Sequence, residues 1–235
     1  MNEKYYCMVP ARIGSQRLKK KNLAMLNGKP LISYAIQAAV GSDKFSKVLV
    51  NSDDVVFEQI AHDYGAEFYL RPGDLGSSDT NSDEVVFDFF LAHPQADVCV
   101  WVNPIAPLQS PLEIAAALEF FKDNDLDSMI TCDRKSVHCA YSSMPINFSE
   151  QEKFAKTQDL IPIDMFNYWV MAWRRDAFLS SYNDNGYGFF CGKFMTYPST
   201  HEFDVIIKTK KDLLLAEVLM QLEHREISYY HGIKI

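Results

Sequence analysis

The residues best suited to chemistry stand together near the start of the chain, in the segment PARIGSQRLKKKN at positions 10–22. Five cations fall within ten residues of a chain whose formal net charge is −8: Arg12, Arg17, Lys19, Lys20 and Lys21. Arginine grips phosphate through paired hydrogen bonds, and lysine binds it as a point charge. The segment therefore predicts a phosphate site, with a solvated basic loop as the alternative.

Small and amide residues in the same segment support an anion site. Gly14 allows the backbone to approach a ligand closely, and Ser15 and the loop N–H groups can donate hydrogen bonds. Asn22 suits recognition of a base, because its amide both donates and accepts; the alternative is a turn residue before a helix. The segment contains neither GxxxxGK[ST] nor GxGxxG, so it is not a P-loop or a dinucleotide-binding turn.

The elements that must position this segment alternate between strand and helix. Near-continuous apolar runs predict strands at residues 5–9, 47–51, 66–70, 97–102, 128–132, 165–173 and 193–197. Helical periodicity predicts helices at residues 31–40, 55–64, 83–92, 112–122 and 213–222. This order predicts an α/β fold with a parallel-dominated sheet covered on both faces, and a site at the carboxyl ends of the strands.

We expect a single domain over residues 1–235, with an excursion at residues 133–164. The excursion is polar and weakly periodic, and it contains Pro145 and Pro162. Such a stretch fits a surface excursion, a lid or an oligomerisation arm.

Composition narrows the class of protein. The chain of 235 residues is 48% hydrophobic and 23% charged, as is usual for a globular protein. Its acidic balance argues against a general nucleic-acid binder, and no apolar run is long enough to span a membrane. The five cysteines are scattered and odd in number, which favours reduced thiols and a cytoplasmic location.

With these elements in place, the N-terminal motif resembles a known family. A-R-x-G-S-x-R-L-x-x-K-N followed by N-G-K-P-L-I-x-Y-A-I-x-A-A is similar to the opening of the CMP-N-acylneuraminate synthetases and of their relatives for other nonulosonic acids and Kdo. The resemblance covers about residues 9–137 and, loosely, 167–217. It implies a Rossmann-like three-layer α/β/α nucleotide-diphospho-sugar transferase fold, CTP as donor, Mg²⁺, pyrophosphate release and a homodimer.

The resemblance also implies roles for the nucleotide-binding residues. Nucleotidyl transfer depends mainly on positioning and electrostatics, so we expect Arg12 and Lys21 to act on the phosphates. An Arg-Pro pair before an Asp-Thr-x-Ser segment is similar to a loop of the family, which implies that Arg71 contacts ribose or base and Ser82 the cytosine edge. Taken alone, Ser82 reads equally well as the N-cap of the following helix.

The predicted metal ligands are Glu202 and Asp204, in the segment HEFDV. Magnesium prefers hard oxygen ligands, and alternate residues of a strand share one side. The family has two aspartates here in an I-D-I-D motif. Either Asp204 takes the second position and Glu202 replaces the first, or Asp204 takes the first and Ile206 stands at the second. The plain alternative is two exposed carboxylates without a metal.

The acceptor side departs from the family pattern. Asn103 and Gln109 stand where the family's L-Q-P-T-S-P-L-R has glutamine and arginine, and Asn167 opens the counterpart of its N-G-x-I-Y-I segment. We expect these three residues to bind a sialic-acid-like 2-keto sugar acid. The alternatives are another anionic acceptor such as a phosphonate or a phosphorylated metabolite, a nucleotide-binding homologue without turnover, and a glycosyltransferase of similar fold.

Overall fold

A seven-stranded sheet in the order β11-β7-β10-β6-β1-β4-β5 organises the computed structural model, which describes residues 3–200 and 205–222. Its strands are β1 Tyr5–Ala11, β4 Lys47–Ser52, β5 Glu67–Leu70, β6 Val98–Val102, β7 Ser128–Lys135, β10 Ile163–Arg174 and β11 Phe194–Pro198. All run parallel except β10, which is antiparallel to both of its neighbours. The predicted parallel-dominated mixed sheet is confirmed.

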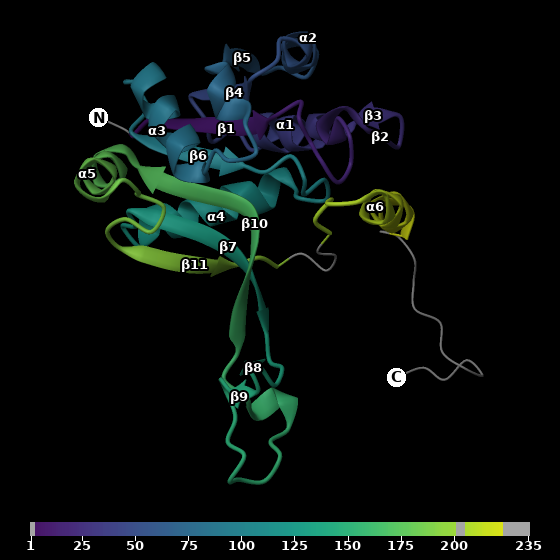
Figure 1. Cartoon of the computed structure of the whole chain (residues 1–235), viewed down its shortest axis with the longest axis vertical. Helices are drawn as coiled ribbons and strands as arrows, with labels where there is room; N and C mark the ends of the chain where they lie inside the picture. Colours follow the sequence, from purple (N-terminus) through teal and green to yellow (C-terminus); the bar gives the residue numbers. More distant parts are fainter. Residues whose placement is uncertain (1–2, 201–204, 223–235) are drawn as a thin grey trace.

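Helices cover both faces of the sheet, as the predicted three-layer α/β/α fold requires (Figure 1). The covering helices are α1 Leu31–Gly41, α2 Val56–Asp63, α3 Ser82–Ala92, α4 Pro111–Asp123 and α5 Arg175–Asn185. The remaining helix, α6 Lys210–Leu222, packs in a separate cluster with Leu26 and Leu31. Buried side chains of α1, α2 and α4 pack on one face, and those of α3 and α5 pack on the other. Strand β6 contributes side chains to both layers: Val98 and Val100 pack in the first layer, and Cys99 packs in the second.

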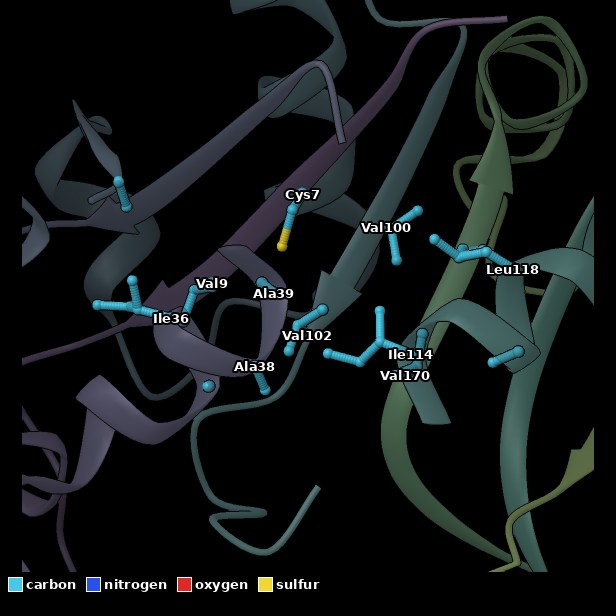
Figure 2. Packing of buried hydrophobic residues seen from close by; sticks show 14 of the residues in the cluster. Cys7, Val9, Ile36, Ala38, Ala39, Val100, Val102, Ile114, Leu118 and Val170 are labelled. Carbon is cyan, nitrogen blue, oxygen red and sulfur yellow. The ribbon is translucent and has the colours of Figure 1, made fainter. Parts of the chain in front are cut away.

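The first of these layers is a dry aliphatic core. Figure 2 shows it between the central strands and two helices, with the labelled residues Cys7, Val9, Val100, Val102 and Val170 from strands and Ile36, Ala38, Ala39, Ile114 and Leu118 from α1 and α4. Burial of this apolar surface fixes β1 and β6 side by side. Their carboxyl ends, and the loops that follow them, are thereby held in register.

Short elements complete the chain. The two-residue strands form two hairpins: β2 Met25–Leu26 with β3 Lys29–Pro30, and β8 Ala140–Tyr141 with β9 Met144–Pro145. The 3₁₀ helices are η1 Lys21–Leu23, η2 Gly73–Gly76 and η3 Thr157–Asp159. Within the described residues, no helix is both long and apolar enough to cross a membrane.

The ends of α3 and α5 differ from what the sequence predicts. Asn81, not Ser82, is the N-cap of α3: its Oδ1 accepts from the Glu84 N–H at 2.9 Å, and Glu84 Oε2 accepts from the Asn81 N–H at 2.9 Å. The N-cap reading of Ser82 is therefore wrong. Helix α5 was not predicted, although Gly186 ends it in the left-handed conformation that favours glycine (φ 81°).

The excursion is an arm that projects from the body of the molecule (Figure 1). Strands β7 and β10 remain paired as far as Lys135 and Ile163, so the arm leaves the sheet as a two-stranded ladder. At its root, Arg134 Nε donates to Asp164 Oδ1 at 2.6 Å and Arg134 Nη2 donates to Oδ2 at 2.7 Å. These bonds lower the pKa of Asp164 to about 2. Whether the arm acts as a lid or in oligomerisation stays a prediction.

The five cysteines, Cys7, Cys99, Cys132, Cys139 and Cys191, are all free thiols. Cys7 and Cys99 lie fully buried in strands β1 and β6, where burial raises the pKa of both thiols. The expectation of reduced thiols is confirmed. The aromatic run at residues 229–231 also predicts a terminal strand, and these residues lie outside the described ones.

Candidate active site

A cavity of about 370 Å³ opens at the carboxyl ends of β1, β5 and β6. The loops that follow these strands form its walls, as expected for a parallel-dominated sheet. Seven of the predicted site residues line it: Arg12, Ser15, Lys21, Asn22, Arg71, Ser82 and Asn103. The structure therefore brings together residues that are up to 91 positions apart in the sequence.

The wall after β1 is strongly basic. Arg12 Nη1 donates to the Ser77 carbonyl at 3.1 Å, and Lys21 Nζ donates to the Ile207 carbonyl at 3.2 Å. Burial, together with the nearby charges of Arg17, Arg12 and Lys208, lowers the pKa of Lys21 to about 8. A cluster of cations that depress one another in this way is stabilised by a polyanion.

Asn22 is a buried polar residue with an unpaired acceptor. Only 4% of its surface is exposed, and its Oδ1 has no hydrogen-bond partner among the described residues. An unpaired buried carbonyl oxygen costs free energy, so it is satisfied best by a donor on a ligand. The exocyclic amino group of cytosine is such a donor.

Arg71 joins the ends of three strands. Its Nη1 donates to Asn51 Oδ1 at 3.2 Å, and its Nη2 donates to the Ala11 carbonyl at 3.2 Å and to Asp53 Oδ1 at 3.4 Å. The guanidinium is buried, and Nε has no partner among the described residues. Arg71 lines the cavity, but most of its donors hold β1 and β4 in place; its contact with ribose or base stays a prediction.

The segment at residues 73–82 forms the polar wall. Thr80 Oγ1 donates to the Asp74 carbonyl at 3.0 Å, and Ser82 lines the cavity with its hydroxyl free of the capping role. Gly76 packs against Asp53 so closely that a Cβ at residue 76 would lie 2.3 Å from Asp53 Oδ2. The absence of a side chain at residue 76 therefore lets this wall dock on the loop after β4.

Two of the residues predicted to bind the acceptor substrate are buried within the protein. Gln109 is buried, and its Nε2 donates to the Asn103 carbonyl at 3.0 Å. Asn167 is also buried: its Oδ1 accepts from Thr131 Oγ1 at 2.6 Å, and its Nδ2 donates to Ser199 Oγ at 2.9 Å. Neither lines the cavity. Gly14 is outside the lining as well, and a Cβ there would meet open space.

The predicted magnesium ligands Glu202 and Asp204 lie outside the described residues. The described lining of the cavity contains no aspartate or glutamate. No group of three or more histidine, cysteine, aspartate or glutamate residues within residues 3–200 and 205–222 could hold a metal ion. The described part of the site is therefore not suited to a divalent cation, and magnesium stays a prediction.

Trp101 and Lys208 are among the lining residues that sequence reasoning missed. Trp101 stands near the carboxyl end of β6, where its side chain was assigned to a buried strand. Lys208 reaches the cavity because the N–H of Ile207 donates to the Ile105 carbonyl at 2.8 Å. No local pattern reveals a pairing between residues that lie about a hundred positions apart.

Comparisons with known proteins indicate the same family as the motif at residues 10–22. The protein is similar to the N-acylneuraminate cytidylyltransferase of Streptococcus agalactiae serotype V, with 25% identity over 216 residues, or 88% of this chain and 51% of the relative. It is also similar to post-translational flagellin modification protein B of Campylobacter coli, with 27% identity over 92% of this chain and 94% of the relative. The resemblance to the N-acylneuraminate family is thus confirmed.

One solved structure supports the fold. CMP:2-keto-3-deoxy-manno-octonic acid synthetase complexed with CTP superposes with a TM-score of 0.70 at 18% identity, covering 94% of this chain and 100% of that one. The chain spans about half the length of the N-acylneuraminate cytidylyltransferase it matches. Residues 6–226 match the family described as Cytidylyltransferase, and because that match covers nearly the whole chain, the protein belongs to the cytidylyltransferase family.

Proposed function

We propose that the protein transfers CMP from CTP to a sialic-acid-like 2-keto sugar acid and releases pyrophosphate. The observation that carries this proposal is the cavity itself. Its lining includes the basic side chains of Arg12 and Lys21 and the unpaired amide oxygen of Asn22. The basic side chains suit a triphosphate, and the amide oxygen suits the edge of a base. A nucleoside triphosphate carries both groups.

In this proposal the chain's own residues bind and orient the two substrates. Arg12, Ser15 and Lys21 hold the triphosphate, and Asn22 and Ser82 face the base. A hydroxyl oxygen of the acceptor gives up its proton to solvent and forms a bond to the α-phosphorus, in line with the bond that breaks to the bridging oxygen. Pyrophosphate leaves with that electron pair, and the basic wall stabilises the charge that develops on it.

The names of relatives support the acceptor class. The Streptococcus agalactiae relative is named for N-acylneuraminate, and the motif at residues 10–22 resembles the opening of that family. The second candidate is a cytidylyltransferase for another anionic acceptor, a phosphonate or a phosphorylated metabolite. It is favoured by Gln109 and Asn167, because both are buried in hydrogen bonds within the protein and neither presents a charge to the cavity.

Three further expectations belong to the proposal. Mg²⁺ is assigned to Asp204 and Glu202, and no step above depends on it. A homodimer is supported by the projecting arm, which exposes large apolar side chains such as Tyr141 and Phe154, the latter 83% exposed. A cytoplasmic location is supported by the five free thiols.

The test is pyrophosphate release from each of the four nucleoside triphosphates. Each is paired with N-acetylneuraminate, Kdo, a phosphonate and a phosphorylated sugar. We expect release with CTP and a sugar acid only. Release with CTP and only the phosphonate or the phosphate would favour the second candidate. Release with no pair, or with another nucleotide, would contradict the proposal.

A further inference from the structure

The position of Lys208 at the cavity is fixed by the residue before it, Ile207. Ile207 is fully buried in a cluster with Leu26 and Leu108. The Ile207 N–H donates to the Ile105 carbonyl at 2.8 Å, and its carbonyl accepts from Lys21 Nζ at 3.2 Å. Residue 208 therefore leaves a fixed backbone at the cavity rim, and its side chain lines the cavity.

The ammonium of Lys208 forms no ion pair within the described part of the chain, and the described lining of the cavity contains no carboxylate. Asp212 is close, but its Oδ2 caps α6, accepting from the N–H of Lys208 at 2.9 Å and the N–H of Thr209 at 2.7 Å. The charges of Lys208 and Asp212 attract each other, but the carboxylate is hydrogen-bonded to backbone donors. The ammonium at the cavity is therefore only partly compensated by the described residues.

Five cationic side chains line one cavity whose described lining contains no acid. They come from three separate parts of the chain: Arg12, Arg17 and Lys21 from the segment after β1, Arg71 (paired with Asp53) from the segment after β5, and Lys208 from the segment before α6. Such a cluster repels itself when empty, and this repulsion adds to burial, the larger cause, in lowering the pKa of Lys21. A polyanion relieves it without any counter-cation.

We infer that Lys208 is a further nucleotide-binding residue, which contacts the triphosphate of CTP. We infer as well that the cations of the protein neutralise this triphosphate, so that CTP binds in the absence of magnesium. The identity of the nucleotide rests on the proposed function. The role of Lys208 rests on the charge and the geometry of the wall.

The experiment is calorimetric titration of CTP into the full-length protein and into Lys208→Gln, each in EDTA and in excess Mg²⁺. Lys211→Gln is the matched control, because Lys211 is exposed on α6 and does not line the cavity. In EDTA, we expect Lys208→Gln to weaken CTP binding by about tenfold, as for loss of one hydrogen bond to a charged group. Lys211→Gln should bind CTP like the unaltered protein.

The dependence on the metal is the second readout. We expect the unaltered protein to bind CTP with dissociation constants within about threefold of each other in EDTA and in Mg²⁺, a difference well below one charge-assisted hydrogen bond. Binding that requires Mg²⁺ would overturn the inference, as would equal affinities of Lys208→Gln and the unaltered protein. Absence of CTP binding in both buffers would instead contradict the proposed function.

Discussion

Lys21 is the residue whose charge depends most on its surroundings. Burial and three neighbouring cations lower its pKa to about 8, so its ammonium is the first of the cluster to lose a proton as the pH rises. Binding that needs this charge is fully present below about pH 8 and is lost above it. We expect the affinity for CTP, measured by titration calorimetry, to fall as the pH passes upward through about 8, and Lys21→Arg to flatten that profile.

Removal of the same side chain should affect turnover. We expect Lys21→Ala to lower kcat/KM with CTP by about 100-fold, the usual cost of one preorganised electrostatic contact to a transition state. Lys19→Ala is the matched control, since Lys19 is exposed and outside the cavity lining. Steady-state pyrophosphate release measures both variants. Near-normal activity of Lys21→Ala would remove Lys21 from the phosphate site.

In the proposed function, Asn22 selects the base. Its unpaired Oδ1 is placed to accept from an amino group that cytosine has and uracil lacks. We expect Asn22→Ala to reduce the preference for CTP over UTP by about tenfold, because one buried hydrogen bond is lost for CTP only. The ratio of the two kcat/KM values is the measurement. An unchanged ratio would assign base selection to other residues.

At the scale of elements, the polar wall depends on the close approach of Gly76 to Asp53. A Cβ at residue 76 would overlap the carboxylate that pairs with Arg71, so the whole segment at residues 73–82 would have to shift. We expect Gly76→Ala to weaken CTP binding and to lower the Tm by several degrees, as for a clash of about 1–2 kcal/mol.

A matched glycine three residues earlier provides the control for that variant. A Cβ at Gly73 would meet no atom within 4 Å. Gly73→Ala should therefore bind CTP and unfold like the unaltered protein, in the same calorimetric and thermal experiments. If both variants behave alike, the contact between Gly76 and Asp53 does not position the wall.

Elements with a strong local pattern could be predicted from the sequence. The run at residues 98–102 is continuously apolar and forms β6, and Thr209 and Asp212, a Ser/Thr-x-x-acid pattern, form a capping box at the start of α6. Helix α5 was missed because its apolar periodicity is weak: only Phe178 is buried. The direction of β10 was also beyond prediction, since an apolar run does not encode whether a strand is parallel or antiparallel.

At the scale of the whole molecule, the sheet decides which residues meet. The rule for carboxyl ends predicted the edge of the sheet at which the cavity lies. The resemblance to the family was also needed to single out Arg71, Ser82 and Asn103 there. Gln109 and Asn167 show the limit of that rule, because burial turned their amides toward backbone and hydroxyl partners within the protein. The position of Lys208 at the cavity could not be predicted from the sequence, because it depends on the long-range hydrogen bond between Ile207 and Ile105.

The most direct test of the proposed CMP transfer is to identify the product formed from CTP and N-acetylneuraminate by mass spectrometry and phosphorus NMR. We expect one new compound, in which a single phosphodiester joins CMP to the sugar acid, together with one pyrophosphate for each molecule formed. A product that retains two or three phosphates, or a nucleotide pool that stays intact with every sugar acid, would contradict it.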